Sequence, residues 1–173
     1  MIDFADSITI GNYRRWAIEG DYSALLFDGG LMQLNYRMVG GEVVEHRLLY
    51  APCPYKFDPL ELARDPIEEL LDLHRMTDHD ELSMQTAIRF DYAPKNAGDG
   101  HPAAHLTINL SSCRIPVEAP MHPAQFLRFV FEHFYREEWA NNHEYFESLT
   151  RRFEVRAVAE HERLNPHVAW RMA

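Results

Sequence analysis

RFDYAPKNAGDGHPAAHLTINLSSCRIPVEAPMHP, residues 89–123, is the stretch around which the fold of this chain is organised. Residues 84–94 and 104–110 alternate with a period of two, which is typical of strands. A loop rich in Gly, Asn and Asp, residues 95–102, joins them, and Ser111 and Ser112 form a turn before a third strand-like run at 113–117. The stretch therefore predicts consecutive strands of an antiparallel sheet.

One face of this predicted sheet is polar. In the run 104–110, alternate residues are His105, Thr107 and Asn109, whereas the opposite face is aliphatic. In the run 84–94, Arg89 and Asp91 alternate with apolar side chains. If these strands pair and the run 113–117 returns beside them, six polar residues come close together: Arg89, Asp91, His105, Thr107, Asn109 and Arg114.

Such a cluster suits acid/base chemistry on an anionic substrate. Histidine exchanges a proton near neutral pH, arginine binds oxyanions, and a carboxylate orients either group. The candidate catalytic residues are therefore His105, Arg89, Arg114 and Asp91, and the candidate substrate-binding residues are Asn109, Thr107 and His101. We expect a metal-independent phosphoester- or RNA-processing protein, or a nucleotide-binding protein, without a cofactor. The alternative is that these polar side chains only satisfy one another within the sheet.

Before this stretch, the sequence predicts a meander and two short helices. Runs at 22–28, 31–39 and 42–52 have strand length and are separated by Gly pairs. A short helix is predicted before them, at 6–18. Residues 59–76 take a helical period with acidic residues on one side, and Pro66 splits them into two helices.

After this stretch, the pattern is helical. Residues 125–139 are apolar over most of the helix circumference, and Pro123 suits a first turn. A second amphipathic helix is predicted at 142–163. The complete fold class is therefore α+β, with an antiparallel sheet of five or six strands packed against C-terminal helices and short acidic helices inserted mid-sheet. We expect a single domain, residues 1–173.

Charge favours a different class of function. The net charge is −10, and residues 59–83 carry eight acidic and two basic side chains. Nucleic-acid-binding proteins usually present a basic face. The alternative function is therefore a catalytically inert accessory or neutralising protein, which binds a protein partner through its acidic or helical surfaces. The C-terminal helices would provide the contact for that partner or for a homodimer.

The length of the apolar runs and the spacing of possible metal ligands bear on localisation and metal binding. No apolar run approaches the roughly 20 residues of a membrane span, so we expect a cytoplasmic protein that does not enter a membrane. Cys53 and Cys113 lack the spacing of a metal or disulfide motif. We interpret the residues that could bind a metal by type as a solvated turn; they are His74, Asp78, His79 and Asp80.

Several short motifs together resemble a family of small uncharacterised bacterial proteins, a domain of unknown function. The resemblance covers roughly residues 20–140 and centres on HPxxHLxIN followed by CRIPV. It implies a second histidine at the position of Thr107 in relatives, so that this chain lacks one of two paired imidazoles. It also implies a setting among toxin–antitoxin or phage-defence genes, but no reaction, substrate or cofactor. The matching motifs are Leu49-Tyr50-Ala51-Pro52, Arg89-Phe90-Asp91-Tyr92, His101-Pro102, His105-Leu106, Ile108-Asn109, Arg114-Ile115-Pro116-Val117 and Phe134-Tyr135.

Overall fold

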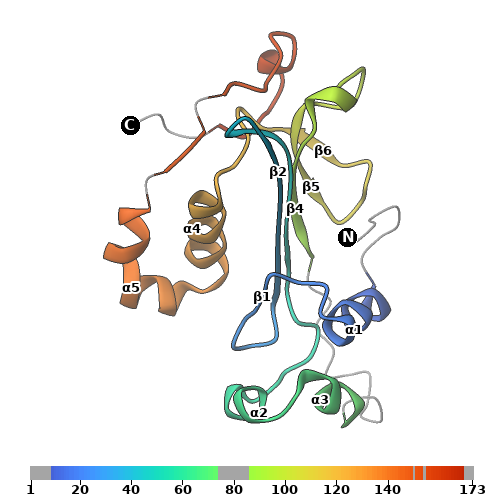
Figure 1. The fold of residues 1–173 in the computed structure, drawn as a ribbon, viewed down its shortest axis with the longest axis vertical. Coiled ribbons are helices and arrows are strands. Elements are labelled where there is room, and N and C mark those ends of the chain that lie inside the picture. The colour runs from blue at the N-terminus through green and yellow to red at the C-terminus, as the bar shows by residue number, and fades with distance from the viewer. Residues whose placement is uncertain (1–8, 74–85, 150, 154, 170–173) are drawn as a thin grey trace. The chain divides into compact units, whose positions relative to one another are not determined.

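The computed structural model describes residues 9–73, 86–149, 151–153 and 155–169. These residues form an α+β fold whose six strands lie in one sheet in chain order, β1-β2-β3-β4-β5-β6 (Figure 1). The predicted antiparallel sheet of five or six strands is confirmed. The strands are β1 (Ala24–Leu25), β2 (Leu31–Val39), β3 (Glu42–Ala51), β4 (Ile88–Tyr92), β5 (Ala104–Ile108) and β6 (Arg114–Pro116).

The helices occupy the places in the chain that the sequence predicts. One precedes the strands, two lie between β3 and β4, and two follow β6, which confirms the acidic insertion and the C-terminal helices. None of the helices in the described part of the chain combines the length and the apolar composition that a membrane crossing needs. The helices are α1 (Ile10–Glu19), α2 (Pro59–Arg64), α3 (Ile67–Leu73), α4 (Pro123–Phe134) and α5 (Arg136–Ser148).

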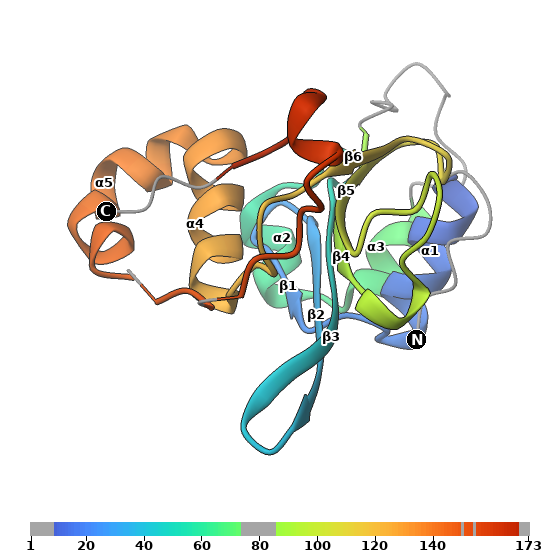
Figure 2. The same cartoon turned by 90° about the horizontal axis from the view of Figure 1, so that it is seen from above.

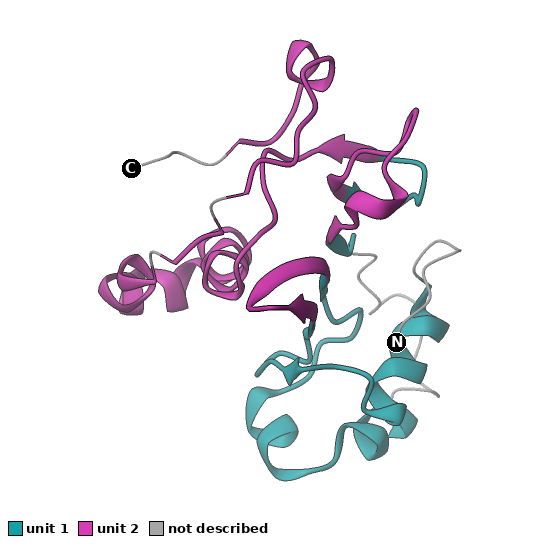
Figure 3. Ribbon diagram, turned by 45° about the horizontal axis from the view of Figure 1, so that its top comes forward, with its two compact units in different colours: residues 1–35, 47–89, 107–113 teal, residues 36–46, 90–106, 114–173 magenta. Residues whose placement is uncertain are grey.

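The chain divides into two compact units (Figure 3). The first unit consists of residues 1–35, 47–89 and 107–113. The second unit consists of residues 36–46, 90–106 and 114–173. Four of the boundaries between these ranges fall within strands, namely β2, β3, β4 and β5. The expectation of a single domain, residues 1–173, stays a prediction.

The first unit is built around α1. The Thr9 side chain accepts a hydrogen bond from the Asn12 N–H at 3.1 Å, and Gly20 ends the helix in a left-handed conformation, φ 67°. Trp16 is fully buried in the core of this unit. Arg14 joins α1 to α3 by donating a hydrogen bond to the Leu71 carbonyl at 2.6 Å. Polar contacts at the helix surface thus supplement an aromatic core.

The second unit is built around α4. His122 caps this helix, because its Nδ1 accepts the Ala124 N–H while the Gln125 side chain accepts the His122 N–H. Phe126 and Phe129 then place their rings edge-on against Phe90 of β4, at 6.3 Å and 5.2 Å between centroids. These contacts fix α4 against the sheet portion of its own unit.

The C-terminal helices differ in extent from the predicted ones. The helix that begins at Pro123 ends at Phe134, and Tyr135, with φ −125° and ψ 62°, separates it from α5. The predicted helix at 142–163 is wrong, because α5 ends at Ser148 and the described residues from 151 to 161 are not helical. Their backbone groups form hydrogen bonds with a distant segment, because the N–H groups of Ala157 and Val158 both donate to the Glu118 carbonyl. Pairing with a distant segment replaces the local helix.

Candidate active site

A buried ion pair links two strands of the second unit. Asp91 lies in β4 and His105 in β5, and the Asp91 Oδ2 atom is 3.4 Å from His105 Nε2. Both side chains are buried, with 8% and 3% of their surface exposed. A buried carboxylate is costly unless it is paired, so this contact accounts for two polar side chains inside the sheet.

The second nitrogen of His105 also faces an oxygen. Its Nδ1 atom lies 3.1 Å from the Pro102 carbonyl oxygen, three residues earlier in the chain. A neutral imidazole has only one N–H, whereas the doubly protonated ring donates to both the Pro102 carbonyl and Asp91. The two oxygen atoms therefore hold the His105 ring in one orientation.

His101 lies directly against this ring. The centroids of His101 and His105 are 5.0 Å apart, with the rings edge to face. Backbone hydrogen bonds between Gly98 and His101, 3.0 Å in each direction, hold the loop that presents His101. Unlike His105, His101 is only partly buried. The buried strand histidine thus supports a more accessible one.

The electrostatics of this cluster favour a neutral His101. Burial lowers the pKa of His101 from its ordinary value of 6.5, and the neighbouring His105 and Arg114 lower it further because each disfavours a second positive charge. Asp91 has a smaller, opposite effect on this pKa. A neutral imidazole beside a cationic guanidinium can accept a proton while the guanidinium holds an anion.

Four of the seven predicted site residues thus come together in the second unit: Asp91, His101, His105 and Arg114. Arg89, Thr107 and Asn109 belong to the first unit. Arg89 is buried in β4, and Thr107 is buried in β5. Asn109 is exposed just after β5 and has a left-handed backbone, φ 60°, which Asn adopts more readily than most residues. Its presence there has a conformational reason, and its binding role stays a prediction.

A family comparison covers nearly the whole chain. The family model described as "Uncharacterized conserved protein (DUF2290)" matches residues 3–170. The chain belongs to this family. The match agrees with the resemblance in the sequence to a domain of unknown function. No curated protein and no solved structure matches the chain.

The sequence analysis missed His46, a buried histidine that acts electrostatically with Asp91 and His105. Its Nε2 atom accepts the Met121 N–H at 2.9 Å, and the Tyr36 hydroxyl donates to the Met121 carbonyl at 2.8 Å. Its ring also contacts Tyr92, at 5.7 Å between centroids. Burial lowers the pKa of His46 from 6.5 to about 4, so the ring is neutral. One signal was present: His46 alternates with Leu48 and Tyr50, which lie on the buried side of a strand.

The residues that could bind a metal by type were compared with the arrangement that a metal site requires. Within ranges 9–73, 86–149, 151–153 and 155–169, no group of three or more His, Cys, Asp or Glu residues is arranged to hold a metal ion. The run that contains His74, Asp78, His79 and Asp80 lies outside the described residues. Cys53 and Cys113 are free thiols. Imidazole, guanidinium and carboxylate groups are thus the chemistry that the cluster offers.

Proposed function

We propose that this DUF2290 protein cleaves phosphodiester bonds in RNA by imidazole acid/base catalysis. The observation that carries the proposal is the series of contacts from Asp91 through His105 to His101, which ends on a partly accessible ring beside Arg114. In this assignment His101 is the general base, Arg114 binds the phosphate, and Asp91 and His105 are positioning residues. The same cluster without turnover would be a nucleotide-binding site.

Burial decides between the two histidines. His105 is 2% exposed and both its nitrogens already face oxygen atoms, so a substrate cannot reach it without displacing those partners. His101 is partly exposed, and its pKa is lowered, which keeps the base form available at neutral pH. In this proposal the acid/base role is therefore assigned to His101, and the catalytic role of His105 stays a prediction.

Arg114 adds the group that binds the anion. It begins β6 and is only partly buried. Its effect on the pKa of His101 shows that the two side chains are electrostatically close. Its Nε atom is buried and has no hydrogen-bond partner among the residues that the structure describes. A phosphate held by the guanidinium would place the reacting bond beside His101.

The test is cleavage of a short single-stranded RNA by the purified wild-type protein and four variants. We expect His101→Ala and Arg114→Ala to lower the rate by about 10²–10⁴-fold, the usual contribution of one acid/base group. His143→Ala and Arg152→Ala are matched controls, because both residues are exposed and lie outside the cluster. Equal rates in all five proteins, or no cleavage by the folded wild type, would remove this proposal.

A second candidate function rests on the first unit. The helices α2 and α3 expose two leucines, Leu60 at 79% and Leu73 at 71%, among acidic residues. Exposed apolar side chains with acidic neighbours suit a protein partner with a basic surface. In the second unit, Tyr145 of α5 is also 63% exposed, at the C-terminal helices where we predict a partner or homodimer contact. An accessory or neutralising protein of this kind would suit the toxin–antitoxin or phage-defence setting that the sequence resemblance implies.

For this second candidate, we expect Leu60→Asp with Leu73→Asp to abolish co-purification of a basic protein from the native host at low and moderate salt. Lys56→Asp is the matched control, because Lys56 is an exposed residue just before α2. Recovery of the wild-type chain alone under both conditions would count against an interaction function, whatever the activity on RNA.

A further inference from the structure

The described C-terminal residues form an extra edge beside β6. Val168 and Val117 form a parallel bridge, in which the Val168 N–H donates to the Pro116 carbonyl at 2.9 Å and the Glu118 N–H donates to the Val168 carbonyl at 2.8 Å. In Figure 2 this segment, in red, runs beside β6. Residues close to the C-terminal end of the chain are thereby brought to the sheet that carries the histidine cluster.

The pairing register places His167 on the same face as His105. The Val117 N–H donates to the Ala104 carbonyl of β5 at 2.9 Å, so Ala104, Val117 and Val168 lie in one row across three neighbouring segments. Their neighbours form the next row, and alternation along each segment turns that row to the opposite face. That row consists of His105, Pro116 and His167. At about 4.8 Å per strand, the backbones of His105 and His167 are about 10 Å apart.

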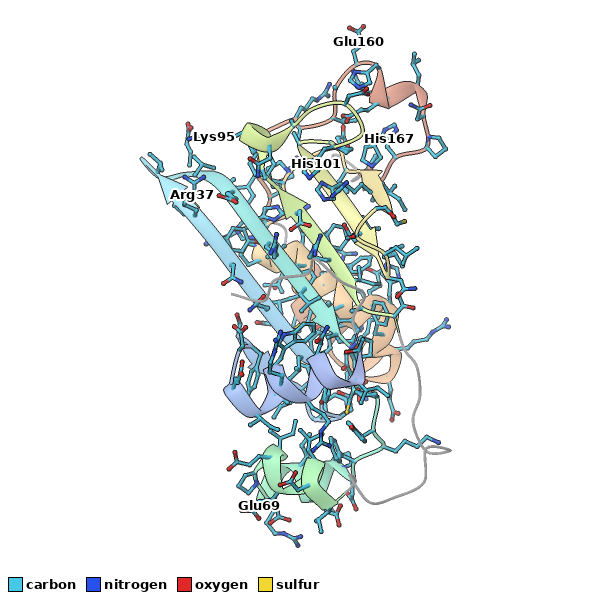
Figure 4. All side chains as sticks on the ribbon, turned by 90° about the vertical axis from the view of Figure 1, so that its right-hand side faces the viewer. Arg37, Glu69, Lys95, His101, Glu160 and His167 are labelled. Carbon is cyan, nitrogen blue, oxygen red and sulfur yellow. The ribbon has the colours of Figure 1, made fainter. Side chains whose placement is uncertain are left out.

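His167 is prepared for proton transfer at a single nitrogen. Its Nδ1 atom lies 3.0 Å from the Asn165 carbonyl oxygen, which takes the N–H at that position. The Nε2 atom is left to hold or release a proton. The residue is only partly buried. Figure 4 shows His101 and His167, both labelled, at the same end of the sheet near β5 and β6.

We propose that His167 is the general acid of this site and the second imidazole of its acid/base pair. The proposal rests on the RNA-cleaving function above and adds the group that protonates the leaving oxygen. Nothing in the local sequence around His167 indicates this role. Where the family resemblance implies a second histidine at the position of Thr107, this chain has threonine, and the C-terminal edge supplies another imidazole.

The reaction balances without any further reactant. The ribose 2′-oxygen forms a bond to phosphorus while His101 takes its proton, and the bond from phosphorus to the 5′-oxygen breaks while His167 gives that oxygen a proton. The products are a 2′,3′-cyclic phosphate and a free 5′-hydroxyl. Arg114 stabilises the negative charge that builds on the phosphoryl oxygens. RNA is the substrate class because DNA lacks the 2′-hydroxyl that attacks.

The experiment compares two leaving groups. One substrate is a dinucleotide of RNA, and the other is a nucleoside 3′-phosphate esterified with p-nitrophenol, whose anion leaves without a proton. We expect His167→Ala to lower dinucleotide cleavage by about 10²–10⁴-fold and cleavage of the aryl ester much less. His101→Ala should lower both. His161→Ala is the matched control, since it is exposed on the same C-terminal segment.

The outcomes separate the two proposals. If His167→Ala cleaves the dinucleotide at the same rate as His161→Ala while His101→Ala is inactive, the proposed role of His167 is wrong and the proposed RNA-cleaving function stands. Equal losses on both substrates in His167→Ala would also overturn the general-acid role. If the wild type cleaves neither substrate, both proposals fall. His167→Gln, which keeps a polar side chain, and recovery of activity with added imidazole separate a chemical loss from a folding defect.

Discussion

Asp91→Ala is expected to destabilise the protein by about 3–5 kcal/mol, the usual cost of removing one partner of a buried ion pair. The Asp91 carboxylate faces His105 Nε2 at 3.4 Å, and both side chains are almost completely shielded from water. Without the carboxylate, the buried Nε2 atom of His105 loses the oxygen atom that faces it. Urea unfolding at neutral pH measures the change in the free energy of unfolding.

Two further variants make this prediction specific. Asp99→Ala removes an exposed carboxylate from the loop between β4 and β5 and should change stability by less than about 0.5 kcal/mol. The double variant Asp91→Ala/His105→Ala should lose less than the sum of the single losses, because the two residues interact directly. Additive losses would show that the ion pair contributes nothing of its own to stability.

The second large effect is a loss of stability in acid that depends on His46. In the folded protein the pKa of His46 is lowered from 6.5 to about 4, chiefly by burial. Between these values the unfolded chain binds the proton and the folded chain does not, so stability falls as the pH falls. This one group should lower the free energy of unfolding by about 2 kcal/mol at pH 5 and about 3 kcal/mol at pH 4, relative to neutral pH.

The measurement is urea unfolding of the wild type and His46→Gln from pH 7.5 to pH 4. Glutamine can still accept the Met121 N–H through its amide oxygen but does not titrate. We expect His46→Gln to lose much less stability over this range than the wild type. Two titratable neighbours also act on His46: Asp91 raises its pKa, and His105 lowers it. An unchanged acid loss in His46→Gln would assign the effect to other groups.

His46 and Tyr36 also connect stability to the proposed site. Together they bind both polar groups of the Met121 peptide, immediately before the residue that caps α4. The α4 helix then packs on Phe90, the residue directly before Asp91. Protonation of His46 would break its bond to Met121, so the arrangement of the site and its tolerance of acid should depend on the same buried ring.

The sheet could be predicted because its signals are local. Period-two alternation identified 84–94 and 104–110 as strand regions, and the Gly pair at 40 and 41 takes the positive φ angles, 61° and 86°, that a tight turn between β2 and β3 requires. The composition of the site was also visible. The sequence alone predicts Asp91, His101, His105 and Arg114 as site residues, without the contacts between them.

The roles within the site could not be predicted in the same way. Alternation placed His105 on a polar face and suggested an acid/base group, and the structure buries it between Asp91 and the Pro102 carbonyl. Burial depends on what covers a strand, which the strand itself does not encode. His101, which the sequence predicts as a substrate-binding residue, is the more accessible of the two histidines.

The C-terminal segment shows most clearly that a local sequence pattern does not always predict the secondary structure. An amphipathic pattern at 142–163 predicted a helix, but the N–H groups of Ala157 and Val158 donate to Glu118, and Val168 pairs beside β6. The sequence by itself determined the α+β class, the succession of strands and helices along the chain and the residue types of the candidate site. Only the tertiary structure decided which histidines meet, because cross-strand partners are set by hydrogen bonds between residues far apart in the chain.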